Sequence, residues 1–363
     1  MNTSLPEDVQ SFQISEALLH VAAEALLRGH GHGRARHSSL KLPLRVGTRA
    51  SPLALVQTRA FVARLTRFCP RLRDMGAIKE VQMTTIADRN QVARLADIGG
   101  KGLFSREIHD VLLEGKIDLA VHSLKDLETE LPPGIVLGCT LRREDARDAL
   151  LLRDRSKAAR AKAGSVGDLL ACLPEGAMIG CSSVRRQAQL LHARPDLRFC
   201  LLRGNVQTRI DKLQAGACDA TLLALAGLRR LDMADRADVI LPPDVMVPAS
   251  GQGIVGVTVR ESDHELRELL AAVEDPESRA VATAERAFLA ELDGSCRTPV
   301  GAYAVMERGR LHMESVLSTP DGRFERRAHA QSTLREAAAL GRSLAARLRA
   351  ETPPAQFAAI TAP

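Results

Sequence analysis

The sequence predicts an α/β protein that ends in a separate, smaller α+β domain. The chain has 363 residues, of which 45% are hydrophobic and 26% charged, so it can form several packed domains. From Pro43 onward, short apolar runs alternate with runs of helical periodicity, which is typical of parallel strands joined by helices. After residue 300 the pattern changes to alternating strand-like residues and a helix near 334–350, which indicates the second domain type.

The first strand and helix units are marked by their boundary residues. Ser51 is a favourable N-cap and Pro52 fits the first helical turn, so a helix is expected to begin there. Gly115 is placed to end the next helix, which follows a glycine-rich stretch. The expected elements of this half are a strand at 44–48, a helix at 53–65, a helix at 103–115 and a strand at 117–121.

Three further units follow a charged, loop-like stretch at 154–171, which we interpret as a domain boundary or an insertion. The expected strands are 178–181, 198–202 and 220–225, followed in turn by helices at 184–194 and 206–216 and by the segment 226–230. Residues 241–243 mark a second break, residues 247–253 are turn-like, and a long helix is expected at roughly 275–292.

Arginine dominates the basic residues. Lysine occurs at eight positions, and the other 42 of the 50 basic residues are arginine, whose planar guanidinium binds carboxylates and phosphates in a bidentate manner. With a net charge of +6, this composition predicts an anionic partner. Nucleic acid is disfavoured because aromatic residues make up only 2% of the chain, too few for base-stacking platforms. No apolar run approaches ~18 residues, so no membrane partner is expected.

Cations gather where the predicted strands end. In an open α/β sheet the ligand lies beyond the carboxyl ends of the strands, where helix N-termini favour anions. Cationic and hydroxyl side chains follow five successive strands: Arg49 and Ser51; Ser123 and Lys125; Ser182, Ser183, Arg185 and Arg186; Arg203 and Arg209; Arg229 and Arg230. Because one phosphate needs only one or two cations, this row predicts a long cleft for a ligand with many carboxylates.

Asp126 is the one carboxylate in this row, and two interpretations remain open. It could form a structural salt bridge with a neighbouring cation, since nearby positive charge keeps a carboxylate ionised. It could instead stabilise a cationic intermediate and relay protons.

The seven cysteines are scattered and form no C-x-x-C pair, which favours a reduced, cytoplasmic setting. Six of them fit small buried hydrophobic residues: Cys69, Cys139, Cys172, Cys181, Cys200 and Cys218. Cys296 differs because it lies in a tight loop beside Arg297, and a neighbouring cation lowers the pKa of a thiol and makes it a better nucleophile.

Residues 1–42 are expected to be an extra and flexible N-terminal segment. Residues 15–27 have the pattern of a short amphipathic helix, and residues 30–39 are a basic linker rich in Gly and His. The alternating histidines could hold a metal, but we favour a solvated tail, and no metal site is expected.

At this point the motifs identify a family: the chain resembles the hydroxymethylbilane synthases, also called porphobilinogen deaminases, over roughly residues 43–350. Each motif alone is modest evidence, whereas all of them in order are highly specific. The motifs are RVGTRASPLALVQT, GGKGLFSREI, DLAVHSLKDL, REDARDAL, IGCSSVRRQAQLL, LRGNVQTRIDKL, LALAGLRRL, PASGQGIVG and AERAFLAELDGSCRTPVG.

The resemblance implies two α/β domains like those of periplasmic binding proteins, arranged around a cleft, plus a small C-terminal α+β domain. The expected divisions are 43–146 with 252–272, 147–248, and 275–363. The family also implies a covalent dipyrromethane cofactor, to which four porphobilinogen units are added stepwise with loss of ammonia. Hydrolysis then releases 1-hydroxymethylbilane. A monomer is expected.

Residue roles follow from the same resemblance. Cys296 would hold the cofactor by a thioether bond, and Asp126 would be the catalytic carboxylate. The expected cofactor contacts are Lys125, Ser183, Arg185, Arg186 and Asp126, and the expected substrate contacts are Arg49, Ser51, Lys101, Arg203, Arg209 and Arg230.

Two other functions compete with this one. The first is a solute-binding or sensing module of similar fold without chemistry, which would need no cysteine-bearing third domain. The second is a nucleic-acid-binding protein, which the positive charge alone suggests. A covalent cofactor distinguishes the enzyme from both.

Overall fold

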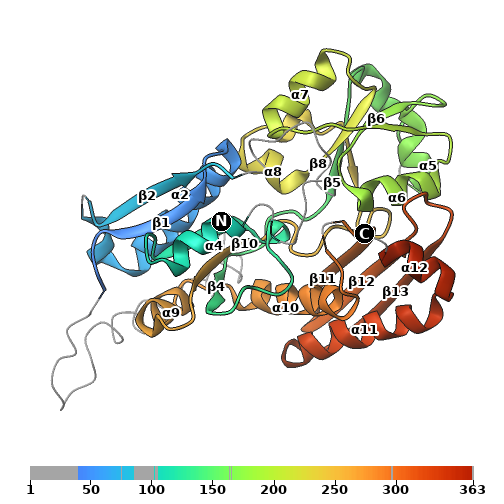
Figure 1. Cartoon of the computed structure of the whole chain (residues 1–363). Coiled ribbons are helices and arrows are strands. Elements are labelled where there is room, and N and C mark those ends of the chain that lie inside the picture. The colour runs from blue at the N-terminus through green and yellow to red at the C-terminus, as the bar shows by residue number, and fades with distance from the viewer. Residues whose placement is uncertain are drawn as a thin grey trace, which may run out of the picture.

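The computed structural model describes residues 40–74, 76–85, 102, 105–162, 164, 166–295 and 297–361. Three lobes surround a common centre, each built on its own β-sheet (Figure 1). Lys101, Cys296 and residues 1–39 of the expected N-terminal segment lie outside the described residues. Leu40, which we expected to belong to that segment, packs against the first lobe.

The first lobe contains a five-stranded sheet of order β2-β1-β3-β10-β4. β1, β2 and β3 are parallel, whereas β10 pairs antiparallel with both β3 and β4. The strands are β1 (Leu44–Arg49), β2 (Ile78–Met83), β3 (Leu119–Ser123), β4 (Ile135–Thr140) and β10 (Val255–Arg260), and the helices are α2 (Pro52–Phe68), α4 (Arg106–Leu113) and α9 (His264–Ala271). Most of this lobe precedes residue 141, but β10 returns to it from late in the sequence.

The second lobe repeats this arrangement, with the strand order β7-β6-β8-β5-β9. Here β5 is the strand that pairs antiparallel with both neighbours, β8 and β9. The strands are β5 (Asp148–Leu152), β6 (Met178–Gly180), β7 (Arg198–Cys200), β8 (Ala220–Ala224) and β9 (Val239–Leu241), and the helices are α5 (Val166–Leu169), α6 (Val184–Ala193), α7 (Val206–Gln214) and α8 (Leu225–Arg230). Two chain segments therefore cross between the lobes, one before β5 and one before β10.

The third lobe is an antiparallel sheet of three strands with helices packed on it. Its elements are β11 (Val300–Glu307), β12 (Arg310–Ser318), β13 (Glu325–Ser332), α10 (Pro276–Glu291), α11 (Ala337–Glu351) and α12 (Pro354–Thr361). α10 and α11 approach closely at Gly341, where an added Cβ would lie 2.1 Å from the carbonyl oxygen of Ala284. Glycine is needed at this crossing because no side chain fits between the two backbones.

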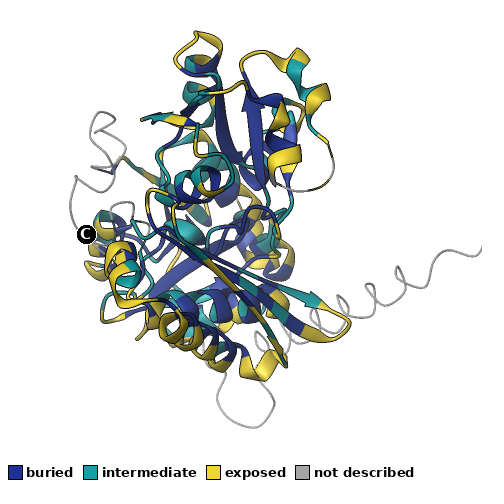
Figure 2. Ribbon diagram, turned by 90° about the vertical axis from the view of Figure 1, so that its right-hand side faces the viewer, coloured by how far each residue is buried: buried dark blue, intermediate teal, exposed yellow. Residues whose placement is uncertain are grey.

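The cores explain why the lobes are stable units. The central strands of the sheets are buried (Figure 2), and in the first lobe Phe61 and Leu65 of α2 cover the sheet with no exposed area. Burying one such side chain stabilises the fold by roughly 1.5–3 kcal/mol. The core of the third lobe also includes Leu124, Leu127 and Ile254, so it is continuous with the lower edge of the first lobe.

The predicted α/β fold class is confirmed, with corrections in detail. The sheets are mixed, because β5 and β10 run against their neighbours. The stretch 154–171 is not a boundary: it lies inside the second lobe between β5 and β6, where a 3₁₀ helix (Arg155–Arg160) packs Ala158 against the core. In the described part of the chain, no helix is long and apolar enough to span a membrane.

Candidate active site

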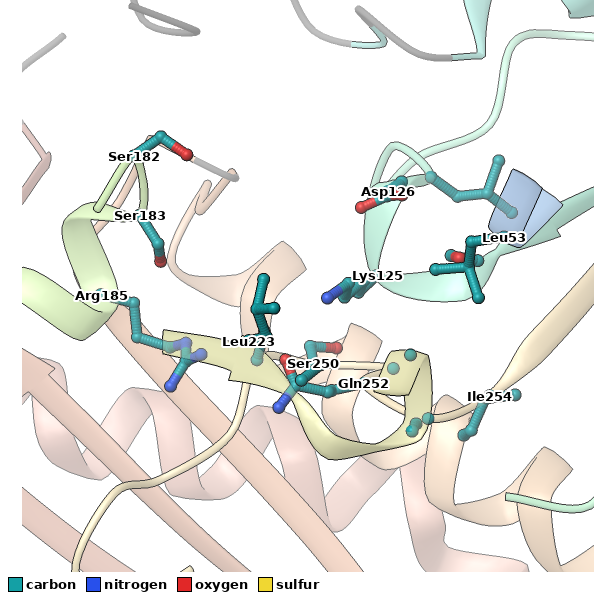
Figure 3. Close-up of a pocket in the computed structure, with 18 of the residues that line it drawn as sticks. Leu53, Lys125, Asp126, Ser182, Ser183, Arg185, Leu223, Ser250, Gln252 and Ile254 are labelled. Carbon is teal, nitrogen blue, oxygen red and sulfur yellow. The ribbon is translucent and has the colours of Figure 1, made fainter. Parts of the chain in front are cut away.

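A cleft of about 850 Å³ lies between the lobes. Its walls come from the carboxyl ends of β1 and β3 on one side and of β6, β7 and β8 on the other. Figure 3 shows Lys125 and Asp126 on the first wall facing Ser182 and Ser183 on the second, with Ser250 and Gln252 below them. This volume is in the range of sites that enclose a multi-ring organic ligand.

The cleft brings together every predicted site residue that the structure describes. The group consists of Arg49, Ser51, Lys125, Asp126, Ser183, Arg185, Arg186, Arg203, Arg209 and Arg230. Arg229, which we expected beside Arg230, instead pairs with Glu144 at 2.9 Å and Asp145 at 3.2 Å, because successive helical residues point in different directions. Ser51 stands at the N-cap of α2 but makes no side-chain cap bond, contrary to expectation.

Asp126 and Lys125 project from a single 3₁₀ turn (Leu124–Asp126) that directly follows β3. Leu124 is buried beneath this turn and anchors it. The Oδ2 atom of Asp126 lies 3.7 Å from Nη1 of Arg49, at the end of the adjacent strand β1. Both early interpretations of Asp126 are therefore compatible with its position, since it is paired with a cation and also lines the cleft with about a third of its side chain exposed.

Lys125 has an altered acidity. The pKa of Lys125 is lowered to about 8, chiefly by burial among protein atoms; the charge of Asp126 acts to raise it, and the charges of Arg186 and Arg185 act to lower it. Near neutral pH the side chain is thus an ammonium that gives up its proton more readily than an exposed lysine. A carboxylate bound beside it would strengthen its charged form.

We expect this acidity to be visible in trace acetylation of the apoprotein between pH 6 and 10.5, because only neutral amines react. Lys125 should reach half of its maximal reactivity near pH 8. A short lysine-containing peptide added to the same reaction is the control, and it should keep gaining reactivity up to about pH 10.4, the ordinary pKa of a lysine side chain. Mass spectrometry measures the acetylation of both lysines. The same midpoint for both lysines would show that burial does not perturb Lys125.

Arg185 and Arg186 are held by a buried carboxylate that sequence analysis did not single out. Asp148, the first residue of β5, is fully buried and accepts bonds from Nη2 of Arg185 and Nη2 of Arg186, each at 2.8 Å. Gln252 donates to the same carboxylate at 2.8 Å. Burial alone would raise the pKa of Asp148, but the two guanidinium groups reverse this effect and hold it well below its usual range. Asp148 therefore fixes the two arginines at the start of α6.

Some donor capacity in this group is left unused. Nε of Arg185 is buried and has no hydrogen-bond partner among the described atoms. Buried polar atoms nearly always have partners, so an orphaned donor at a cleft wall indicates a place where a ligand acceptor fits.

Arg209 and Arg230 extend the cationic surface along the second wall. The pKa of Arg209 is lowered to about 10, chiefly by burial and in addition by the charge of Arg186. Nε of Arg209 donates to the carbonyl of Gly204 at 2.9 Å, and Nη2 of Arg230 donates to that of Gly253 at 2.6 Å. Each guanidinium thus uses one N–H group to bind the protein backbone, and its other N–H groups can bind a carboxylate.

Gly253 matters because it lies where the two crossing segments meet. Its φ of +88° is in the left-handed region, and an added Cβ would lie 2.3 Å from the carbonyl oxygen of Glu144 on the other segment. Only glycine avoids both the strained φ and the clash with the carbonyl oxygen. The floor of the cleft is therefore closed by direct backbone contact between the segments.

The comparisons with known proteins agree with this geometry. The family model for the cofactor-binding domain of porphobilinogen deaminase matches residues 44–268, and that for its C-terminal domain matches residues 280–350. A porphobilinogen deaminase of Sorangium cellulosum is 44% identical over 310 residues, which cover 84% of this chain and 98% of that relative. The chain belongs to the porphobilinogen deaminase family. A chloroplastic family member from rice is 45% identical over 280 residues, covering 77% of this chain and 75% of the relative.

Solved structures similar to this member of the porphobilinogen deaminase family include periplasmic binding proteins. One from Brucella ovis with glutathione bound is 16% identical and covers 69% of this chain and 68% of its own, with a TM-score of 0.37. A sulfonate-binding protein from Methylobacillus flagellatus gives a TM-score of 0.33 at 16% identity over 66% and 67% of the two chains.

The first family model names a dipyrromethane cofactor, and the cleft fits such a group. Among the described residues, eight cationic side chains line the cleft: Arg49, Lys125, Arg185, Arg186, Arg203, Arg209, Arg230 and Arg297. Only three carboxylates line it with them: Asp126, Glu128 and Asp293. A dipyrromethane with acetate and propionate arms is a polyanion, so this excess of cations matches its charge.

Proposed function

We propose that this protein is a hydroxymethylbilane synthase that builds 1-hydroxymethylbilane from four porphobilinogen units on a dipyrromethane primer attached to Cys296. The observation that carries the proposal is the row of cations that five strand ends bring into one cleft, with the carboxylate of Asp126 among them. The family match over residues 44–268 and 280–350 supports the reaction class.

Substrate binding follows from the cationic walls. Each porphobilinogen carries an acetate and a propionate, and an arginine fork binds a carboxylate through two parallel hydrogen bonds. We assign substrate carboxylates to Arg49, Lys101, Arg203, Arg209 and Arg230, with Ser51 as a further donor. Cofactor carboxylates are assigned to Lys125, Arg185 and Arg186, with Ser183 beside them. When bound, the dipyrromethane supplies the pyrrole carbon that accepts the first substrate unit.

Asp126 is assigned the chemical step. Loss of ammonia from porphobilinogen leaves a cationic methylene-pyrrole, and the carboxylate of Asp126 would stabilise this charge in a cleft where cations outnumber carboxylates. After the new carbon–carbon bond forms, the attacked pyrrole carbon must lose its proton, and the same carboxylate can accept or relay it. Arg49, 3.7 Å away, would keep Asp126 oriented between these steps.

We also propose the domain division predicted from the sequence, 43–146 with 252–272, 147–248 and 275–363. Membership of β10 in the first sheet supports the return of 252–272 to the first domain. A cytoplasmic, monomeric enzyme is proposed, and the six described cysteines, all of them free thiols, are in the state that a reducing compartment maintains.

The test is the intact mass of the purified protein beside a Cys296→Ala variant. We expect extra mass equal to two linked pyrrole units in the wild type and its loss in the variant. Cys200→Ala is the control, because Cys200 is a partly exposed thiol on β7 and should leave the extra mass in place. Conversion of porphobilinogen by the loaded protein completes the test.

Two results would overturn the proposal. One is a wild-type protein that carries no extra mass, gains none with porphobilinogen and has no turnover, which would favour a binding module. The other is extra mass that persists in Cys296→Ala, which would move the attachment to another residue.

A further inference from the structure

Arg297 lies on the cleft at the end that the third lobe supplies. It is the residue after Cys296, and it lines the cavity together with Ser295, Thr298 and Thr361, the last residue of α12. Its backbone is fixed: its N–H donates to Oγ of Ser295 at 3.2 Å, and the N–H of Ser295 donates to Oγ1 of Thr298 at 3.0 Å. The backbone at Ser295 and at Arg297 is therefore held by local hydrogen bonds.

The guanidinium of Arg297 has an unmet bonding requirement. Its Nε is buried and has no hydrogen-bond partner among the described atoms. Other arginines of the cleft are engaged, since Arg186 binds Asp148, Arg209 binds Gly204 and Arg230 binds Gly253. A buried donor without a partner is unfavourable, so the Nε of Arg297 would gain from an acceptor that arrives with a ligand.

The position of Arg297 next to Cys296 in the chain indicates which part of the ligand it would contact. Arg297 lines the cavity and directly follows Cys296 in the chain, and consecutive Cα atoms are 3.8 Å apart, so a ligand attached to that cysteine would begin one residue from Arg297. The family's cofactor has acetate and propionate arms on each ring, and an arginine fork matches a carboxylate.

We propose that Arg297 binds a carboxylate of the first pyrrole ring, the ring joined to Cys296. This inference rests on the proposed function. It gives Arg297 a role in capturing and holding the primer, separate from the walls that bind later rings. The specific competing role is electrostatic, in which the cation only lowers the pKa of the adjacent thiol.

The test uses apoprotein prepared from cells unable to make porphobilinogen, with loading by added porphobilinogen followed by intact mass. We expect Arg297→Gln to raise the half-saturating porphobilinogen concentration for loading at least about tenfold. The value for Arg297→Lys should lie between those of the wild type and Arg297→Gln, because lysine keeps the positive charge but lacks the planar guanidinium. Arg323→Gln is the matched control, since its side chain is 89% exposed and far along the chain from the cleft residues.

A second measurement separates carboxylate binding from thiol activation. Iodoacetamide is neutral, so its rate of reaction with Cys296 in the apoprotein reports the thiolate alone. We expect the alkylation rate to change less than twofold in Arg297→Gln, while the half-saturating porphobilinogen concentration for loading rises about tenfold. An alkylation rate that falls about tenfold as well would overturn carboxylate binding in favour of thiol activation.

The failures of the two proposals are distinguishable. Equal loading by Arg297→Gln and the wild type overturns the role of Arg297 and leaves the proposed function intact. Absence of loading in the wild type overturns the proposed function and this inference with it. Thermal unfolding midpoints of the Gln and Lys variants within about 1 °C of the wild type ensure that loading rather than folding is compared.

Discussion

An Asp126→Asn variant is expected to fold, to retain the capacity to load its cofactor and to turn over porphobilinogen at least about 10²-fold more slowly. Asparagine keeps the shape of the side chain but cannot neutralise a cationic intermediate or accept a proton. It would also leave Arg49, 3.7 Å from the carboxylate, without that negative partner. The loss should appear mainly in kcat, because the arginines that bind the substrate carboxylates are unchanged.

Single-turnover measurements with loaded protein test this directly, since they follow the first addition without product release. Glu128→Gln is the matched control: Glu128 lines the same cleft two residues away, and the change removes one negative charge without touching Asp126. We expect the control to stay within about threefold of the wild type. Near-normal turnover by Asp126→Asn would remove Asp126 from the mechanism and leave it as a structural ion-pair partner.

An Asp148→Asn variant is expected to lose about 3–5 kcal/mol of unfolding free energy, the usual cost of leaving a buried charge without its partner. The carboxylate is fully buried, and it holds both Arg185 and Arg186. Asparagine can bond to part of this arrangement but leaves two guanidinium groups beside each other without a counter-charge. The defect should also weaken primer binding, because these two arginines are assigned to the cofactor.

The pH dependence of this loss has a definite sign. Because the pKa of Asp148 is held well below its ordinary value, its contribution is fully present above the unfolded-state pKa of about 3.9 and is lost as the pH falls below it. The stability gap between wild type and Asp148→Asn should therefore be constant from pH 5 to 7 and narrow below about pH 4.

Urea unfolding across this pH range measures the gap. Asp154→Asn removes an exposed carboxylate that pairs with Lys157, and it should leave the midpoint unchanged at pH 7. A midpoint for Asp148→Asn equal to that of the wild type at pH 7 would show that the arginines find other partners.

Much of the site could be predicted because strand ends are visible in the sequence. An apolar run followed by a capping residue locates the carboxyl end of a strand, and parallel strands bring such ends together. Arg49 and Lys125 were therefore predicted to meet although they lie far apart in the sequence. Lys101 and Cys296 lie outside the described residues, so their positions remain predictions.

The remainder depends on contacts that no local pattern encodes. Asp148 was missed because its partners, Arg185 and Arg186, are 37 and 38 residues away. In addition, the strand β5 that begins at Asp148 reads as an ordinary apolar run. The strand β10 was not among the predicted elements, and its direction has no local signal because an apolar strand has the same pattern whichever way it runs. Arg229 and Arg230 are neighbours in the sequence and point in different directions from α8. The packing of α8 decides which of the two faces the cleft.

The position of β10 also sets the order in which the two sheets can form during synthesis of the chain. β4 is an edge strand that joins its sheet through β10, so residues 135–140 must wait for residues 255–260 to leave the ribosome. At ordinary translation rates this delay is on the order of ten seconds. The second sheet, composed only of residues 148–241, can assemble within that interval. Until β10 arrives, β3 presents an open edge to the cell, and a nascent chain in that state is the form most in need of a chaperone.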